Sequence, residues 1–471
     1  MAMKDPPLTS PAPGGPTIKP LGGAKPASPP ADKQGKEPPK DREKDKASPK
    51  PPAAAKEAKP GTRLTSVDAY RGLVMLLMAS AGFGFKLVAE TFPVIWNMKG
   101  FLYWPYPNQP PSPWPGLADQ FSHVAWQGCA IWDLIQPSFM FLVGVAMPFS
   151  YAARRAKGNS YLGTLGHAAV RCVMLVLLAI LLASQGHKQT EFVFTNVLAQ
   201  IGLGYLFVFL LVNRGMILQT LTLVAVLGGY GYLFYQHPLP GPDYDYAAVG
   251  AQPKDLLPGE QGHWSKNTNF AAEVDRKFLN LFPRKEPFRF NPAGYCTLNF
   301  IPSIATMLLG LMAGELLRGA QTQQRKVLWL IAGGAVCLAA GLGLGLTIVP
   351  IVKKIWTPSW ALVSGAAALW LLAAMYWIID VRGFRRWAYP LVVVGANSIL
   401  MYLMSSLMSV WIVANLRTIF GPEALGGAFG TIAVPALLDV AYAPIIRSLA
   451  VLAVLWMICF WLYRQRVFIK I

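Results

Sequence analysis

Charged residues are scarce in this 471-residue chain: they make up 14% of it, whereas hydrophobic residues make up 54%. An ordinary soluble domain carries about a quarter charged residues. The chain instead contains one apolar run after another, each close to the ~20 residues that a membrane-spanning helix needs. This composition excludes an ordinary soluble domain and predicts a polytopic integral membrane protein of the all-α class.

Cysteine is also scarce, and the spacing of the five cysteines fits neither a CxxC pair nor a set of metal ligands. Cys172, Cys337 and Cys459 lie inside apolar runs, where cysteine usually acts as a small hydrophobic residue. We therefore expect no disulfide framework and no metal site. The chain also lacks a P-loop, a GxSxG motif and an HExxH motif, so no short motif identifies a reaction.

The formal charge is +19, which by itself would suggest nucleic acid as a partner. Much of this excess lies in the first 63 residues and in short loops beside the apolar runs. Basic loops of this kind orient membrane proteins, with the positive side in the cytosol. We therefore expect the lipid bilayer as a partner and no nucleic acid.

Residues 1–62 form a low-complexity segment rich in Pro, Lys, Ala and Gly, without the apolar core of a signal peptide. Such a segment cannot bury enough apolar surface to fold, and we expect a disordered cytosolic tail. The remaining residues, 63–471, are expected to form the membrane domain. A scaffold whose tail recruits partners would explain the tail but not the polar residues described below.

The membrane domain is expected to be a bundle of about ten transmembrane helices. The apolar runs are 69–89, 131–151, 164–184, 196–213, 216–235, 298–318, 327–347, 359–380, 388–412 and 438–463. Gly421 and Pro422 interrupt the pattern, so an eleventh span within 400–440 is left open.

Short basic loops predict the orientation of this bundle. The cytosolic connections would read "ARRAKG", "NRG", "RGAQTQQRK", "VRGFRRW" and, at the C-terminus, "YRQRVFIKI". Loop 90–130 and the neutral loop 236–297, with its short amphipathic segment, then lie on the other side. The loop "VPIVKKIWTP" at 349–358 is the exception, because it is basic but falls on the non-cytosolic side. Both termini are expected in the cytosol.

Polar residues at the outer start of the second span are the first candidates for chemistry. His123 is a candidate general base or nucleophile, although an interfacial histidine beside Trp126 in an aromatic belt would look the same. Asp133 is costly at membrane depth unless it is paired or solvated. It marks a cavity or a partner, and structural pairing with an arginine of a neighbouring helix is the favoured interpretation.

Two further polar positions lie within or beside spans. Asp68 and Arg71 share one face of the first helix, either as a salt-bridged cytosolic cap or with Arg71 meeting a phosphate. Asn397 lies inside a span, where an amide usually bonds across helices. On the outer side, the segment containing Asn269, Asp275 and Arg276 could lie on the membrane surface or cover a cavity.

Taken together, these segments resemble the family of transmembrane acetyltransferases related to heparan-alpha-glucosaminide N-acetyltransferase. The matching motifs, in chain order, are "RLTSVDAYRG" (63–72), "HVAWQGCAIWDLIQPSFMFLVG" (123–144), the Asn…Asp-Arg segment (269–276), "NPAGYCTLNFIPSIATMLLGLMAG" (291–314), "KKIWTPSWALVSG" (353–365) and "GANSILMY" (395–402). The tail lies outside this resemblance.

The resemblance implies an acetyl-CoA-dependent N-acetyltransferase that passes an acetyl group from the cytosol to an amine or hydroxyl of a glycan or amino sugar on the periplasmic or lumenal side. The active-site histidine of the family corresponds to His123. We take Asp133 as a second catalytic candidate. Two mechanisms stay open: His123 as the general base in a direct transfer, which we favour, or as an acetylated intermediate.

We assign the other candidates to binding. Arg71, Asp68 and Asn397 are expected to bind acetyl-CoA, with Arg154, Arg155 and Arg171 as weaker candidates. The acceptor is expected to contact Trp126, Asn269, Asp275 and Arg276. A homodimer is left open.

The chain departs from the animal members of the family at three places. Gly82 takes the place of an asparagine near the active site, and Ala199–Gln200 replaces a Gln-Arg pair. The lumenal N-terminal domain of the animal enzyme is replaced by the tail, which favours a bacterial inner membrane. The alternative function is a transporter or flippase without covalent chemistry, although no internal repeat of the kind common in transporters is evident.

Overall fold

The computed structural model describes residues 64–91, 117–420 and 443–469. Within these ranges the chain folds into helices joined by loops, and its only β-type pairing is an isolated bridge between Gln127 and Val352. The predicted tail, 1–62, lies outside the described residues. So do residues 421–442, and with them the second half of the region 400–440 in which an eleventh span was left open.

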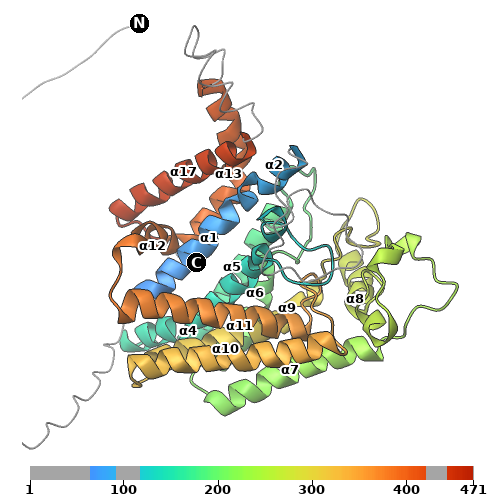
Figure 1. The fold of residues 1–471 in the computed structure, drawn as a ribbon, viewed down its shortest axis with the longest axis horizontal. Coiled ribbons are helices and arrows are strands. Elements are labelled where there is room, and N and C mark those ends of the chain that lie inside the picture. Colours follow the sequence, from blue (N-terminus) through green and yellow to red (C-terminus); the bar gives the residue numbers. More distant parts are fainter. Residues whose placement is uncertain (1–63, 92–116, 421–442, 470–471) are drawn as a thin grey trace, which may run out of the picture. The chain divides into compact units, whose positions relative to one another are not determined.

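Eight helical segments in the described residues are long and apolar enough to cross a membrane, and a bent pair would be a ninth. The helices of these segments are α4 (Ile135–Ala156, preceded by the 3₁₀ turn η2, Ile131–Leu134), α5 (Tyr161–Ala183), α7 (Met216–Gln236), α9 (Phe300–Arg318), α10 (Gln323–Leu346), α11 (Pro358–Met375, continued by η8, Tyr376–Val381), α13 (Ser398–Phe420) and α17 (Ala443–Arg464). The predicted all-α multi-pass membrane bundle is confirmed (Figure 1).

Three of the ten predicted spans differ from a single long helix. The run 196–213 forms the shorter α6 (Val197–Leu210). The run 69–89 is broken into α1 (Thr65–Ala79) and α2 (Phe85–Thr91), which are bent by 41°. The break contains glycines with positive φ, Gly82 at 71° and Gly84 at 68°, a conformation that glycine adopts without steric cost.

The run 388–412 is not one helix, so the prediction of a continuous span is wrong there. α12 (Tyr389–Ala396) ends at Asn397, whose φ of −124° and ψ of 42° are not helical, and α13 then begins. The reason is a tertiary contact. The Asn397 amide donates to Val467 O (3.0 Å) and accepts from Ile469 N (2.9 Å), so it binds the C-terminal segment.

The centre of the bundle is formed by α4, α9 and α11, whose apolar windows are 61–72% buried. Glycines let α4 and α9 approach to backbone contact. A Cβ at Gly144 would overlap Met307 O, and one at Gly310 would overlap Phe141 O. Close packing through small residues is typical of membrane helices, because lipid gives no hydrophobic drive for association. α1 approaches α12 in the same way through Gly72 and Gly395.

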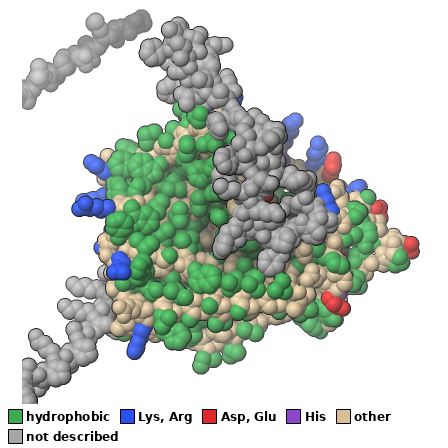
Figure 2. Space-filling view, in the orientation of Figure 1, with side chains coloured by type: hydrophobic (Ala, Val, Ile, Leu, Met, Phe, Trp, Pro, Cys, Tyr) green, Lys and Arg blue, Asp and Glu red, His purple; other side chains and the backbone are tan. Residues whose placement is uncertain are grey.

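The peripheral helices expose their apolar side chains. The windows of α5, α7, α10, α13 and α17 are only 17–28% buried, and hydrophobic side chains cover much of the described surface in Figure 2. Residues such as Leu177 on α5, Leu221 on α7 and Val336 on α10 are more than half exposed. In a membrane protein this surface faces lipid.

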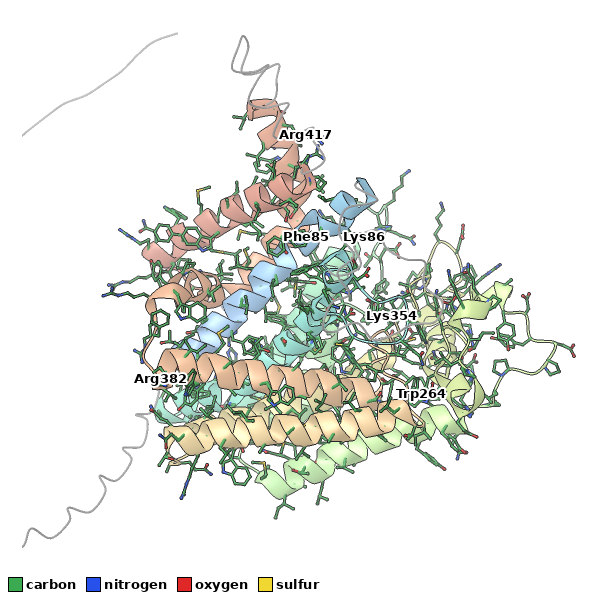
Figure 3. All side chains as sticks on the ribbon, in the orientation of Figure 1. Phe85, Lys86, Trp264, Lys354, Arg382 and Arg417 are labelled. Carbon is green, nitrogen blue, oxygen red and sulfur yellow. The ribbon has the colours of Figure 1, made fainter. Side chains whose placement is uncertain are left out.

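The two ends of the bundle differ in architecture. One end carries the long connection between α7 and α9, which includes α8 (Phe270–Phe278) and several 3₁₀ turns, together with the loop that precedes α11. Lys354 of that loop and Arg382, which follows η8, lie at opposite ends of α11 (Figure 3). We call the end with Lys354 and α8 the outer end and the end with Arg382 the inner end, following the predicted orientation.

Candidate active site

Three polar side chains meet at the outer end of α4. His123 Nδ1 lies 2.7 Å from Asp133 Oδ1. Lys353 Nζ lies 3.1 Å from the same carboxylate oxygen and 3.1 Å from His123 Nδ1. We call these three residues the His123 cluster. They come from three parts of the chain: the loop after α3 (Leu117–Gln120), the turn η2 and the loop before α11.

The local backbone explains why a carboxylate can lie at this depth. Asp133 has no exposed surface, and its second oxygen accepts hydrogen bonds from Val124 N and Ala130 N, each at 3.3 Å. Its first oxygen binds His123 and Lys353, so both oxygens are satisfied. A buried charge is tolerated when it is paired and hydrogen-bonded in this way. The expectation that Asp133 pairs with an arginine of a neighbouring helix is wrong, because its cation is Lys353.

The geometry also assigns the tautomer of His123. A neutral imidazole donates from one nitrogen and accepts at the other, and the carboxylate beside Nδ1 favours a proton on that atom. Nε2 then carries the lone pair. The His123 side chain is 46% exposed, so the lone pair of a half-exposed imidazole is available for proton transfer.

Trp126 is separated from the imidazole by its own hydrogen bond. It is 5% exposed, and its Nε1 donates to Trp264 O at 3.1 Å. Trp264 in turn stacks on Phe234 with ring centroids 4.4 Å apart. Trp126 therefore packs in the outer loop core, rather than pairing with His123 in an aromatic belt.

The predicted acceptor-binding residues of α8 serve the fold of the outer loop. Asn269 is fully buried and caps α8 by accepting from Ala272 N at 3.0 Å. Asp275 accepts from Thr297 N at 2.9 Å, and burial raises its pKa to about 6. Arg276 binds Glu273 at 2.6 Å. No hydrogen bond between these three residues and the His123 cluster occurs in the described structure.

A large cavity opens toward the inner end of the bundle. Its volume is about 670 Å³, and its walls come from α1, α4, α5, α6, α12, α13 and the C-terminal segment. Its cationic side chains are Arg71, Arg154, Lys157 and Arg171, whereas Asp68 is the single acid of its described lining. We call it the basic cavity. Ligand pockets of small molecules have volumes of about 300–1,000 Å³, so it is large enough for a substantial ligand.

The predicted pair on the first helix lies in this wall. Arg71 and Asp68 form an ion pair of 3.4 Å, and both line the basic cavity. The two interpretations of this pair therefore do not exclude each other: it links two side chains at the inner end of α1, and it presents a guanidinium to the cavity.

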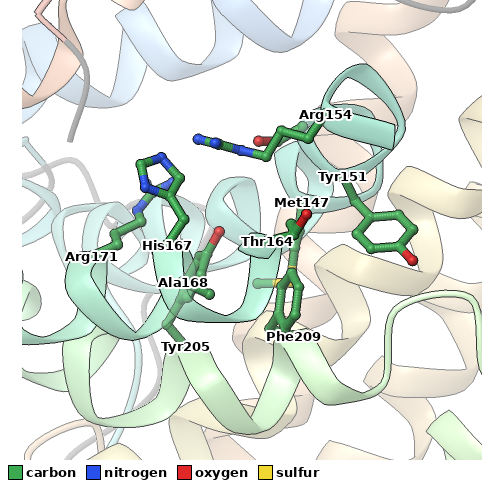
Figure 4. A pocket seen from close by; sticks show the side chains of 10 residues that line it. Met147, Tyr151, Arg154, Thr164, His167, Ala168, Arg171, Tyr205 and Phe209 are labelled. Carbon is green, nitrogen blue, oxygen red and sulfur yellow. The ribbon is translucent and has the colours of Figure 1, made fainter. Parts of the chain in front are cut away.

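A smaller hollow of about 30 Å³ adjoins the basic cavity and shares Arg154, Arg171 and Tyr205 with it (Figure 4). His167 of α5 also faces it. The Arg171 guanidinium lies over the Tyr205 ring, 4.8 Å from its centroid. Guanidinium groups held on an aromatic face keep their N–H groups available for anions. The arrangement favours a phosphate-bearing ligand.

One helix connects the two sites. Asp133 and Arg154 lie at opposite ends of η2–α4, roughly 30 Å apart at 1.5 Å per residue. The face of α4 that lines the basic cavity carries Phe139, Val143 and Met147, so the cavity lining begins roughly 9 Å from Asp133 along the helix. A thin, mostly apolar group could follow this face from the inner end toward the imidazole.

Asn397 does not itself line the basic cavity. Its neighbours Ser398 and Ala396 do, and so does Ile469, whose backbone N–H it binds. Asn397 therefore shapes the cavity by holding the C-terminal segment against it.

The sequence prediction did not include Lys353, Lys157 or His167. A signal for Lys353 was present, because the basic loop 349–358 is the one that violates the charge pattern of the other loops. Such an exception indicates that a lysine serves a contact rather than orientation. Lys157 and His167 carry no sequence signal that separates them from other basic residues near span ends.

Cys129 lies beside the cluster but is a poor nucleophile. Burial and the Asp133 carboxylate raise its pKa to about 12, and the thiolate is the reactive form of cysteine. Across the described residues, the acidic, histidine and cysteine side chains form no group of three that could hold a metal ion. His123 is therefore the strongest candidate base of the cluster.

Fold and site together define a multi-pass helical membrane protein with an acid–base cluster near the outer end of α4 and a basic cavity toward the inner end. No family model matches the chain. It is similar to human (Homo sapiens) heparan-alpha-glucosaminide N-acetyltransferase, with 25% identity over 387 residues, and to the mouse (Mus musculus) protein of that name, with 24% identity over 386 residues.

Each alignment covers 72% of this chain but only 52% and 53% of the two relatives, respectively. The chain thus spans about half the length of the curated relatives it matches. The resemblance seen in the motifs is confirmed as a distant relationship to the heparan-alpha-glucosaminide N-acetyltransferases.

Proposed function

We propose that the protein is a transmembrane acetyltransferase that moves an acetyl group from acetyl-CoA, bound at the inner end, to an amine or hydroxyl of a sugar at the outer end. The observation that carries this proposal is the connection of two sites by one helix. η2–α4 bears Asp133 of the His123 cluster at one end and Arg154 of the basic cavity at the other. The similarity to two named acetyltransferases supports it.

The basic cavity suits the donor. Acetyl-CoA combines a phosphorylated nucleotide with a long, thin arm that ends in the thioester. Arg71, Arg154 and Arg171 would bind the phosphates, since guanidinium groups match phosphate oxygens in charge and geometry. The arm would follow the apolar face of α4 past Phe139 and Val143 and bring the acetyl group near His123.

The His123 cluster suits the transfer. As the acceptor nitrogen attacks the thioester carbonyl, a C–N bond forms and Nε2 of His123 removes a proton from the amine. The C–S bond then breaks, and the imidazolium returns the proton to the departing thiolate. Asp133 accepts the Nδ1 hydrogen bond throughout and stabilises the transient imidazolium, as a carboxylate does in other His–Asp pairs.

The acceptor is proposed to be an amino sugar or another glycan, in line with the glucosaminide in the names of both relatives. The inner end is proposed to face the cytosol, because the Arg-rich connections after α4 and η8 lie there and basic loops stay cytosolic. A bacterial inner membrane fits this orientation, with the His123 cluster open to the periplasm.

The test is an assay of the purified protein in liposomes with acetyl-labelled CoA and a panel of amino sugars. We expect the parent protein to transfer the acetyl group and the variant His123→Ala to lose this activity. The thermal unfolding of His123→Ala should be the same as that of the parent. His187→Ala is the matched control, since His187 is an exposed imidazole that also pairs with a carboxylate, at 3.7 Å from Glu191. Full activity of His123→Ala would show that this imidazole is not the base.

A transporter is the alternative. The broken helix α1–α2, bent by 41°, favours it, because broken helices are common at the binding sites of transporters. The same liposomes distinguish the two functions. A transporter would move a labelled solute across the membrane without consuming acetyl-CoA, whereas the acetyltransferase would release free CoA thiol in proportion to acetylated sugar.

A further inference from the structure

Lys353 brings a cation against the carboxylate that holds His123. The residue is 3% exposed, and its Nζ lies 3.1 Å from both Asp133 Oδ1 and His123 Nδ1. Burial lowers the pKa of Lys353, while the Asp133 carboxylate acts in the opposite direction. A buried ammonium is costly unless it is paired, so the contact with Asp133 is what allows Lys353 to be buried here.

The backbone fixes the ammonium at this place. Val352 N donates to Thr357 Oγ1 (3.0 Å), and Thr357 N donates to Val352 O (3.1 Å), which closes the loop around Lys353. Gly128 N donates to Ile351 O at 2.7 Å, so this loop is joined directly to the segment that contains His123. These bonds fix the backbone on both sides of Lys353, and its buried side chain holds Nζ against Asp133.

The short distance between the two nitrogens has an electrostatic consequence. When Nδ1 carries its proton, both it and the ammonium are donors, so they do not bond to each other and share Asp133 Oδ1 instead. Protonation of Nε2 would then place two positive charges about 3 Å apart. Like charges at such a distance disfavour the charged form, whereas the Asp133 carboxylate alone would favour it.

We propose that Lys353 is a positioning residue that offsets the charge of Asp133 and so keeps His123 unprotonated, and thus active as a base, near neutral pH. The inference rests on the proposed acetyl transfer by His123. The inference goes beyond that function because it gives Lys353 a role in setting the pH range in which the enzyme is active.

The other titratable groups near the cluster do not supply this charge. Lys354 lies next in the chain and interacts with Asp133 only through space, because its Nζ donates to Ala125 O at 2.7 Å instead. Burial raises the pKa of Tyr295 and of Cys129 to about 12, so both are neutral at pH 7. Lys354→Met is therefore a matched control: it removes one positive charge from the same loop without removing the ammonium that contacts Asp133.

The first measurement is the pH–rate profile of acetyl transfer. In Lys353→Met we expect the acid limb to move to higher pH by about 1–3 units, the usual effect of one charge at this distance. Activity at the midpoint of the parent's acid limb then falls by roughly fivefold to several hundredfold, and it recovers at high pH. In Lys353→Arg the acid limb should lie at the same pH as in the parent, because the positive charge at position 353 is present. In Lys354→Met the acid limb should also stay at the pH of the parent.

The second measurement does not depend on activity. Diethyl pyrocarbonate modifies neutral imidazole, so mass spectrometry of the peptide containing His123 reports its protonation across the pH range, with the exposed His187 as internal reference. We expect the labelling midpoint to rise in Lys353→Met. We expect a smaller rise when Lys353→Met is added to Asp133→Asn, because burial lowers the pKa of a Lys353 that has lost its carboxylate partner.

These outcomes separate the two proposals. If the parent protein transfers no acetyl group, the proposed function fails, and the labelling midpoints still decide the role of Lys353. If the midpoint of His123 is the same with and without Lys353 in both backgrounds, the inference about Lys353 is overturned even when acetyl transfer is observed. If Lys353→Met loses activity at every pH while the labelling midpoint of His123 is unchanged, the inference is also overturned. Lys353 would then have only a structural role as the ion-pair partner of Asp133.

Discussion

The two ends of α4 carry different kinds of site. At the outer end, the Asp133 carboxylate before the helix is fully buried and hydrogen-bonded on both oxygens. At the inner end, Arg154 lines the basic cavity. The His123 cluster holds two cationic or basic groups around one acid within about 3 Å of each other. The described lining of the basic cavity spreads four cations and one acid over a volume of about 670 Å³.

This contrast indicates a division of labour. A site that moves a proton needs fixed geometry and a closed set of charges, because its electrostatics act on a single atom. A site that binds a polyanion needs an excess of cations left for the ligand. Variants at the outer end should therefore change turnover and its pH dependence, and variants at the inner end should change the KM for acetyl-CoA.

The largest expected effect is that of Asp133→Asn. An amide in place of the carboxylate no longer holds the Nδ1 proton of His123 or balances Lys353, so turnover should fall by about 10²–10⁴-fold. The KM for acetyl-CoA should stay within about twofold. Steady-state kinetics with donor and acceptor varied separately measures both, with Asp119→Asn as control. A change confined to the donor KM would contradict the assignment of Asp133 to the outer site.

Asp275 is a second buried carboxylate at the outer end, and its replacement should stabilise the protein rather than impair it. Burial raises the pKa of Asp275 to about 6, above the value of about 4 in an unfolded chain. The folded state then binds the proton more tightly, so stability decreases as pH rises from about 4 through about 6. The cost above that range is up to about 3 kcal/mol.

Asp275→Asn removes this cost, and we expect thermal unfolding of the variant at pH 8 to occur at a higher temperature than that of the parent. At pH 4 the two proteins should unfold at similar temperatures. Asp133 is paired with Lys353, whereas Asp275 has no ion pair among the described residues, so thermal unfolding of Asp133→Asn and Asp275→Asn tests whether pairing decides the effect of a buried carboxylate on stability. Equal destabilisation of the variant at both pH values would contradict this explanation.

At the inner end, two adjacent arginines provide a matched comparison. Arg154 lines the basic cavity, whereas Arg155 is exposed and does not. Loss of one charge-assisted hydrogen bond to a phosphate should raise the KM for acetyl-CoA in Arg154→Gln by roughly 10- to 100-fold, because such bonds contribute about 1.5–3 kcal/mol. Arg155→Gln should be close to the parent. Equal effects would show that the arginines act only through the general positive field.

The smallest effect is expected for Asn397→Ala. The substitution removes the two hydrogen bonds to Val467 O and Ile469 N, each contributing about 1 kcal/mol. The C-terminal segment should then leave the cavity wall, with a few-fold rise in the KM for acetyl-CoA and faster trimming by carboxypeptidase. Asn415→Ala is the control, because that amide binds the carbonyl of Trp411 on its own helix. Unchanged trimming would contradict this role of Asn397.

The outer site was partly predictable. His123 and Asp133 were each predicted as candidates because an imidazole and a carboxylate are unexpected before a long apolar run, but the partner expected for Asp133 was an arginine. The sequence separation of ten residues allowed contact but did not require it. Lys353 lies 220 residues from Asp133, and its approach depends on the packing of α11 against α4 and on the turn around Thr357, which no local pattern encodes.

The breaks in the helices were less predictable. Apolar runs of suitable length predict a continuous span, and the runs at 69–89 and 388–412 have that length. Gly82 and Gly84 leave a trace of the first break in the sequence, since glycine permits positive φ. The second break depends on Asn397 binding the C-terminal segment, a contact between distant parts of the chain.

Residue order alone determined that this chain crosses the bilayer repeatedly, because each stretch that enters lipid has to satisfy its own backbone hydrogen bonds and be apolar for about twenty residues. Only the tertiary structure decided which buried charges meet and which cations remain open to a ligand. The reason is physical: the free energy of a buried charge is set by atoms within a few ångströms, and in a helical bundle those atoms come from helices and loops far apart in the sequence.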